Sequence, residues 1–144
     1  MVRFEVSLGD AWREDVDAIV VAASSTSPAV RAARDTPLVV IEIDVPPDPS
    51  RDTFDIHLRS EYGRAMDEVR RAGARRVAIE PVGMSPGGAG AYRAANIAVR
   101  SVRDALFPRP TVELVRFVCR ARRQLDALRQ ALAAAALNRR PYRE

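Results

Sequence analysis

The amino-acid sequence predicts an α/β domain, a three-layer α/β/α sandwich built on a mixed, mainly parallel sheet of about five strands. Apolar runs of strand length alternate along the chain with amphipathic stretches of helical length. Residues 17–23 form a continuous apolar run rich in β-branched side chains, which is typical of a strand covered on both faces. At 144 residues the chain is long enough for one domain with its own hydrophobic core.

Five segments have the pattern of strands, namely 3–8, 17–23, 38–44, 76–82 and 111–119. In the first, apolar Phe4, Val6 and Leu8 alternate with polar residues, as in a half-buried strand. The third must end before Pro46 because proline cannot donate a hydrogen bond to a strand ladder.

Four segments are predicted to be helical, namely 28–34, 55–72, 91–106 and 122–137. The first is a short turn with Ser27 as its N-cap. The longer three repeat apolar residues at helical spacing. Gly73 supplies the stop of the second segment, and Pro108 ends the third.

Composition limits the classes of protein that the sequence can encode. One cysteine, Cys119, and one histidine, His57, exclude an internal disulfide framework and a Cys/His metal cluster, and no cofactor is expected. No apolar run approaches the roughly 18 residues of a membrane span, so we expect a cytoplasmic protein without a membrane partner. The net charge of +4 permits a phosphate-bearing partner without requiring one. The basic segment 138–144 is expected to be a flexible tail of the single domain 1–144.

A glycine-rich stretch, 80–92, joins the fourth predicted strand to the helix that follows it. It contains four of the seven glycines of the chain, which let a backbone approach a ligand closely. Free N–H groups and the helix dipole favour an anion at such a helix start. The spacing matches neither a dinucleotide fingerprint nor a P-loop, so the residues alone leave both a phosphate cradle and a plain turn open.

Ligands of open α/β sheets usually bind beyond the carboxyl ends of the strands. A cleft with a carboxylate at one end and an arginine at another suits a nucleotide diphosphate, since Asp10 can accept from an adenine amino group and Arg120 can lie on a base. The candidate ligand-binding residues are Asp10, Ala22, Ala23, Ser24, Ser85, Gly87, Gly88, Ala89, Gly90, Ala91, Tyr92 and Arg120. The sequence offers no catalytic or metal-binding set.

For several residues, a purely structural role stays open as an alternative to a role in ligand binding. Asp10 after Gly9 is at least as typical of a turn as of a ligand contact. Trp12 fits the core as well as a nucleobase. Cys119 is expected to be a buried, unreactive thiol, and His57 an ordinary surface residue.

Several segments, in order along the chain, resemble the macro domain family. Residues 16–24, Val-Asp-Ala-Ile-Val-Val-Ala-Ala-Ser, are similar to the family's Val-Asp-Ala-Ile-Val-Asn-Ala-Ala-Asn strand, and 8–11 to the Gly-Asp-Ile turn before it. Ser85-Pro-Gly87 resembles the family's Ser-Thr-Gly phosphate loop. The other matching segments are 57–66, 77–81, 94–102 and 111–119. The resemblance therefore covers nearly the whole chain.

Macro domains bind ADP-ribose, and some remove it from proteins. The resemblance implies that Asp10 contacts adenine, that residues 22–24 line the ribose side and that 85–91 wrap the diphosphate. Arg120 stands where the family often has an aromatic residue against adenine, which keeps a stacking role for it. The family's asparagine at the distal ribose is replaced by Ser24, and a glycine loop, a helix and a strand are missing after it.

The sequence therefore predicts a shortened, macro-like module that binds ADP-ribose or a related nucleotide diphosphate without catalysis. One alternative is an ADP-ribosyl hydrolase or phosphoesterase. Another is a degenerate scaffold without a small-molecule ligand, which contacts nucleic acid through residues 120–123 and the tail. A homodimer is a further expectation, because the missing elements would leave apolar surface uncovered.

Overall fold

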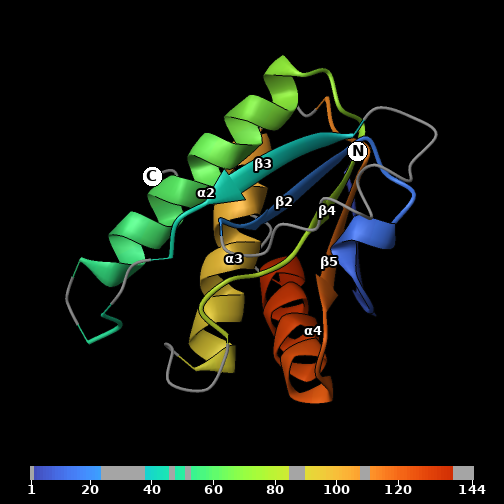
Figure 1. The fold of residues 1–144 in the computed structure, drawn as a ribbon. Helices are drawn as coiled ribbons and strands as arrows, with labels where there is room; N and C mark the ends of the chain where they lie inside the picture. The colour runs from blue at the N-terminus through green and yellow to red at the C-terminus, as the bar shows by residue number, and fades with distance from the viewer. Residues whose placement is uncertain are drawn as a thin grey trace.

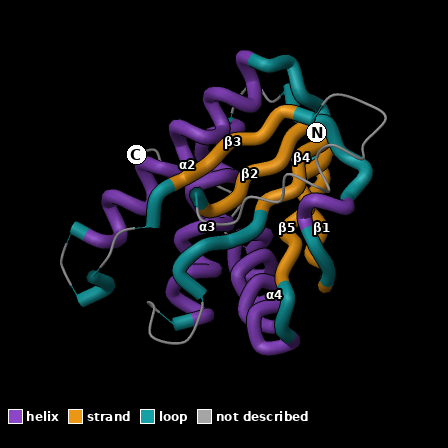
Figure 2. Tube along the Cα trace, viewed as in Figure 1, coloured by secondary structure: helices purple, strands orange, loops and turns teal. Residues whose placement is uncertain are grey.

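The structure is a computed structural model that describes residues 2–23, 38–45, 48–50, 53–84, 90–107 and 111–137. Its elements follow in the order β1 (Arg3–Leu8), the 3-10 helix η1 (Ala11–Arg13), β2 (Ala18–Ala22), β3 (Val39–Ile43), α2 (Phe54–Arg71), β4 (Arg76–Ile79), α3 (Ala91–Leu106), β5 (Leu114–Cys119) and α4 (Arg122–Leu137). Strands and helices alternate as the sequence predicts (Figure 2). The predicted α/β class is confirmed.

The five strands form one sheet in the order β1-β5-β4-β2-β3, and every described strand pair is parallel. β4 lies in the centre, paired with β5 on one side and β2 on the other. The prediction of about five strands, mainly parallel, is confirmed, and no antiparallel pair occurs among the described strands. Because parallel strands end at the same edge, the residues that directly follow the neighbouring strands β1, β5 and β4 lie along that edge (Figure 1).

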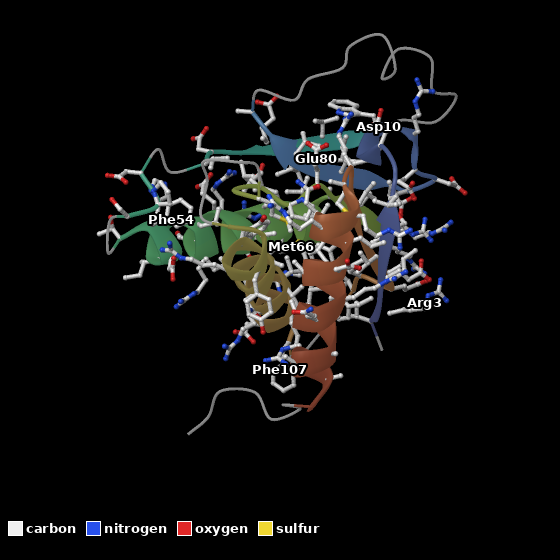
Figure 3. The ribbon with its side chains drawn as sticks, turned by 90° about the horizontal axis from the view of Figure 1, so that it is seen from below. Arg3, Asp10, Phe54, Met66, Glu80 and Phe107 are labelled. Carbon is white, nitrogen blue, oxygen red and sulfur yellow. The ribbon has the colours of Figure 1, made fainter. Side chains whose placement is uncertain are left out.

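Helices α2, α3 and α4 lie beside one another on one face of the sheet (Figure 1). Strand side chains such as Val20, Val77 and Phe117 point toward this face and form the main core with apolar residues of the helices. Met66 of α2 is fully buried in that core, at the helical spacing that the sequence predicts (Figure 3). The helices therefore hold the sheet from one side and leave its carboxyl edge accessible to the connecting turns.

The opposite face carries a second, smaller core cluster beneath η1. Its buried members are Ala11, Trp12, Val16, Ile19, Val21, Ala78 and Val118. Trp12 is only 1% exposed, so it closes the core and does not reach a ligand. The predicted helical turn 28–34, which would add a helix to this face, lies outside the described residues.

Two predicted strands are shorter in the structure. β4 ends at Ile79, since Glu80 still donates its backbone N–H to the carbonyl of Val20 at 2.9 Å but Pro81 has no N–H to continue the ladder. β5 begins at Leu114 because the backbone N–H groups of Glu113 and Leu114 both point to the carbonyl of Arg75, at 2.7 and 3.1 Å. The remaining strands and the three long helices begin and end within one residue of their predicted bounds.

No helix in the described part of the chain combines the length and apolar character that a membrane crossing requires. The segment 138–144, predicted to be a flexible tail, lies outside the described residues. A single domain over residues 1–144 stays a prediction.

Candidate functional site

The carboxyl edge of the sheet brings together residues that are far apart in the sequence. Asp10 follows β1, Arg120 follows β5 and Glu80 follows β4, and these three strands are neighbours in the sheet. Asp10 and Glu80 lie close together over the strand ends in Figure 3. We call Asp10, Glu80 and Arg120 the edge triad.

Asp10 is held in place by the turn that it starts. Its Oδ1 accepts a hydrogen bond from the backbone N–H of Trp12 at 3.1 Å, which makes it the N-cap of η1. Its Oδ2 lies 3.7 Å from Nε of Arg13. The turn-forming interpretation of Asp10 is therefore confirmed, and the same contacts fix the direction of its carboxylate at the sheet edge.

Arg120 stands between two carboxylates. Its Nη2 lies 3.6 Å from Oδ1 of Asp10, and its Nε lies 3.6 Å from Oε2 of Glu80. Its backbone N–H donates to Oε1 of Gln124 at 3.2 Å, which ties the residue to the start of α4. The Arg120 side chain is 63% exposed, and partly exposed ion pairs of this length are weak. A ligand can therefore reach the guanidinium and compete for it.

Ala22 and Ala23 end β2 on the other side of β4. Ala23 donates its backbone N–H to the carbonyl of Ile43 at 3.1 Å, so the turn continues the pairing with β3 for one residue. Ala22 is half-buried and Ala23 is exposed. Their small side chains therefore stand at the sheet edge next to the end of β4.

The start of α3 lies at the same end of the molecule as this edge, because α3 follows β4 in the chain. Gly90 has φ 93° and ψ 145°, a backbone conformation that favours glycine, and a side chain there would meet no atom within 4 Å. The first N–H groups of a helix have no partner within it, so the position of Ala91 and Tyr92 at the helix start favours an anion. The Tyr92 side chain is 52% exposed. The helix start therefore combines donors, open space and an exposed aromatic ring.

A shallow hollow of about 390 Å³ lies between this helix start and α4. The hollow is lined by Gly90, Ala91, Tyr92, Arg123, Asp126, Ala127 and Gln130. Three predicted site residues thus share one concave surface with Arg123, three residues beyond Arg120 in the chain.

Five predicted site residues cannot be placed. Ser24, Ser85, Gly87, Gly88 and Ala89 all lie outside the described residues. The predicted phosphate loop therefore stays a prediction, and the edge triad and the start of α3 are the parts of the site that the structure locates.

Sequence reasoning missed two contributors to this region. Glu80 is the second carboxylate of the edge triad, and its only sequence signal is its position at the end of a buried strand before Pro81. Tyr62 of α2 is fully buried, and its phenol oxygen accepts a hydrogen bond from the backbone N–H of Val82 at 3.0 Å. Burial raises the pKa of the Tyr62 phenol, which keeps it neutral. It fixes the chain that leaves β4 toward the glycine-rich loop.

The predicted burial of Cys119 and the predicted surface position of His57 are confirmed. Cys119 is buried, and its thiol points to the carbonyls of Ser7 and Ala121, at 3.6 and 3.9 Å. Burial raises the pKa of the Cys119 thiol, which keeps it protonated. His57 is exposed in the first turn of α2. Among the described residues, no three His, Cys, Asp or Glu side chains come together as a metal site.

No protein-family model matches the chain, and no curated protein sequence matches it either. Solved structures do match. A mutant of the Oceanobacillus iheyensis macrodomain is 15% identical with a TM-score of 0.72, and the match covers 94% of this chain and 93% of that one. Another mutant of the same macrodomain, with ADPR, is 14% identical with a TM-score of 0.69 over 93% and 94% of the two chains.

The Trypanosoma brucei macrodomain in complex with ADP is 16% identical with a TM-score of 0.68. That match covers 90% of this chain and 68% of the other. The described chain thus has the fold of macrodomains over almost its full length, as its sequence segments predict.

Proposed function

We propose that this macrodomain-like protein binds ADP-ribose or a related nucleotide diphosphate at the carboxyl edge of its sheet. The observation that carries the proposal is the fold, which is similar over more than 90% of both chains to a macrodomain structure with ADPR. The edge triad and the start of α3 lie at the edge where open α/β sheets bind their ligands.

The edge triad and the start of α3 each have a role in this proposal. The Asp10 carboxylate accepts from the exocyclic amino group of adenine, an interaction that η1 prepares by fixing its direction. Arg120 packs its guanidinium plane on the base, with Glu80 and Asp10 holding that plane at the sheet edge. The N–H groups that open α3 face the diphosphate.

We propose binding without catalysis. The sequence lacks the family's asparagine at the distal ribose, where Ser24 stands. An ADP-ribosyl hydrolase or phosphoesterase is the alternative, and turnover of an ADP-ribosylated protein by the purified chain would establish it.

The proposal is tested by titration calorimetry with ADP-ribose, ADP and inosine diphosphate, which carries an oxygen in place of the adenine amino group. ADP should bind more tightly than inosine diphosphate. Asp10→Asn should narrow that difference, since an amide keeps the N-cap of η1 but no longer offers a full carboxylate. Absence of binding by ADP-ribose and ADP at millimolar concentration would overturn the proposal.

A matched pair of arginine variants tests the place of binding. Arg120→Ala should lower the affinity for ADP-ribose about tenfold, which corresponds to a loss of roughly 1.4 kcal/mol in binding free energy. Arg122→Ala removes the same charge from the exposed first residue of α4 and should leave the affinity unchanged. An equal loss of ADP-ribose affinity in both variants would show that Arg120 contributes only through general electrostatic attraction.

The sequence also suggested a homodimer and contact with nucleic acid. The homodimer stays a proposal, and light scattering tests it because a monomer at all concentrations contradicts it. The basic cluster 120–123, predicted to contact nucleic acid, does not act as one unit in the structure, because Arg120 forms ion pairs with two carboxylates. A gel shift that is absent or insensitive to salt would exclude this alternative.

A further inference from the structure

A second concave surface lies between α2 and α3, apart from the edge triad. Its volume is about 600 Å³, a size typical of sites for small ligands. We call it the α2–α3 groove, and it is lined by Asp55, Arg59, Arg93, Asn96, Ile97, Arg100, Ser101 and Asp104. None of these residues belongs to the predicted nucleotide site. The two helices lie side by side over the residues concerned (Figure 1).

One end of the α2–α3 groove is closed by a tightly bonded pair. Oδ1 of Asp55 accepts from Nε of Arg93 at 2.9 Å and from its Nη2 at 2.5 Å. Nη1 of Arg93 donates to the carbonyl of Pro49 at 2.9 Å. The Arg93 guanidinium also lies 5.0 Å from the centre of the Phe54 ring. Arg93 and Asp55 therefore neutralise each other and act as a fixed wall.

This pairing determines the charge of the rest of the groove. Arg59 is one helical turn after Asp55 on α2, where an acid four residues earlier would ordinarily pair with it. Because Asp55 is bonded to Arg93, the exposed Arg59 has no hydrogen bond or ion pair among the described residues. Arg100 of α3 lines the same groove and adds a second guanidinium. At the far end, Asp104 lies 3.6 Å from Nη2 of Arg103.

The groove also contains a buried hydroxyl without a partner. Ser101 is 5% exposed, and its Oγ has no hydrogen-bond partner among the described residues. A buried polar group without a partner is uncommon and costs free energy. Ser101 lines the groove, so a rotation of its side chain would turn the buried O–H toward a ligand oxygen and remove this cost, while the Asn96 side chain adds an amide at the same wall.

We propose that the α2–α3 groove binds a phosphate-bearing small molecule, with Arg59 and Arg100 on the phosphate and Ser101 donating to one of its oxygens. A carboxylate offers two oxygens in a plane, which one guanidinium can satisfy. A phosphate offers three strong acceptors in different directions, which suits two guanidinium groups on facing helices and a hydroxyl between them. The volume left over accommodates an organic body of modest size.

The test is an NMR titration of the full chain with pyrophosphate, at constant ionic strength. Amide shifts should include Arg59, Arg100 and Ser101, beside those that the proposed nucleotide site predicts at the start of α3, and the affinity of the groove is taken from the first set. Arg59→Met should lower the affinity for pyrophosphate about tenfold, as expected for the loss of a charge-assisted hydrogen bond. Arg71→Met removes an exposed arginine from the last turn of the same helix and should have no effect. Malonate, a dicarboxylate of similar charge, should bind more weakly than pyrophosphate.

Ser101→Ala separates a ligand contact from a purely structural role. It should weaken pyrophosphate binding and at the same time raise the melting temperature of the free protein, because it removes the unpaired hydroxyl. Unchanged binding in both Ser101→Ala and Arg59→Met would overturn the proposal, as would equal losses in Arg59→Met and Arg71→Met. Shifts confined to the sheet edge would also overturn it and would leave the proposed nucleotide site intact.

Discussion

The phenol oxygen of Tyr62 accepts the backbone N–H of Val82 at 3.0 Å in the interior of the protein. The residue on α2 thereby fixes the chain three residues after β4 ends, at the start of the glycine-rich loop. Any ligand bound at the carboxyl edge depends on where this chain runs.

Tyr62→Phe should lower the free energy of unfolding by about 1–3 kcal/mol, because the buried N–H of Val82 loses its acceptor. Urea denaturation measures the change. Tyr92→Phe removes the same hydroxyl from an exposed ring and serves as the control, with an expected change near zero. A loss in Tyr62→Phe no larger than in the control would contradict the role given to this hydrogen bond.

Gly90→Ala and Gly73→Ala form a second matched pair. Both glycines have positive φ, 93° and 73°, and a side chain at either would meet no atom within 4 Å. Gly73→Ala should therefore lose about 1–2 kcal/mol of stability from backbone strain alone, and Gly90→Ala at least as much, because φ 93° with ψ 145° lies close to a region that essentially only glycine adopts. Gly90 opens α3 at the proposed site, whereas Gly73 follows α2 at the opposite edge of the sheet.

Only Gly90→Ala should therefore lower the affinity for ADP-ribose. Calorimetry at a temperature where both variants are folded measures this affinity. An equal loss of affinity in Gly73→Ala would mean that stability, and not the helix start, controls binding.

Glu61 should make stability depend on pH. Its pKa is held below the usual 4.5, first by hydrogen bonds from Arg64 and also by the backbone N–H of Asp44, which donates to Oε1 at 2.9 Å. A carboxylate with a lowered folded pKa adds stability above its unfolded pKa and loses it as the pH falls through the folded value. At pH 7 Glu61→Gln should cost about 1 kcal/mol.

The difference between wild type and Glu61→Gln should be constant above pH 4.5 and shrink below it. Urea denaturation at several pH values measures it. Glu68→Gln is the control, because Glu68 bonds the same Arg64 from a more exposed position without a backbone partner. A difference that grows on acidification would contradict this assignment.

The single thiol should react slowly in the native protein. Burial raises the pKa of Cys119, so little thiolate is present at neutral pH, and the side chain is almost inaccessible. Alkylation by iodoacetamide should therefore be much slower in buffer than in urea, where the chain is unfolded. Equal rates would show that the strand end around Cys119 opens readily.

Segments bounded by strong local signals were predicted well from the sequence. Helix α3 has its predicted bounds, because Gly90 and Pro108 stand on either side of a regular apolar pattern. Strand β1 also has its predicted bounds, since strict alternation ends at Gly9. These features depend only on neighbouring residues.

Features that depend on strand order were missed. Glu80 joins Asp10 through Arg120 only because β5 lies between β1 and β4, and no local pattern encodes that order. Helical spacing marks Tyr62 as a core residue, but its partner depends on the path of the chain after β4. The missing partner of the Ser101 hydroxyl likewise depends on how the helices pack, because Ser101 is buried only in the folded protein.

One aromatic ring connects the two proposed sites. Phe54 is only 2% exposed. On one side it lies close to Gly83, in the chain that leaves β4, since a methyl group on Gly83 would lie 3.7 Å from Cζ of Phe54. On the other side, the Arg93 guanidinium lies over the face of the Phe54 ring. A ligand that moves the Phe54 ring at one site changes the free energy of binding at the other site. Linkage makes that influence reciprocal, so the factor by which pyrophosphate alters ADP-ribose affinity must equal the factor measured in the reverse order.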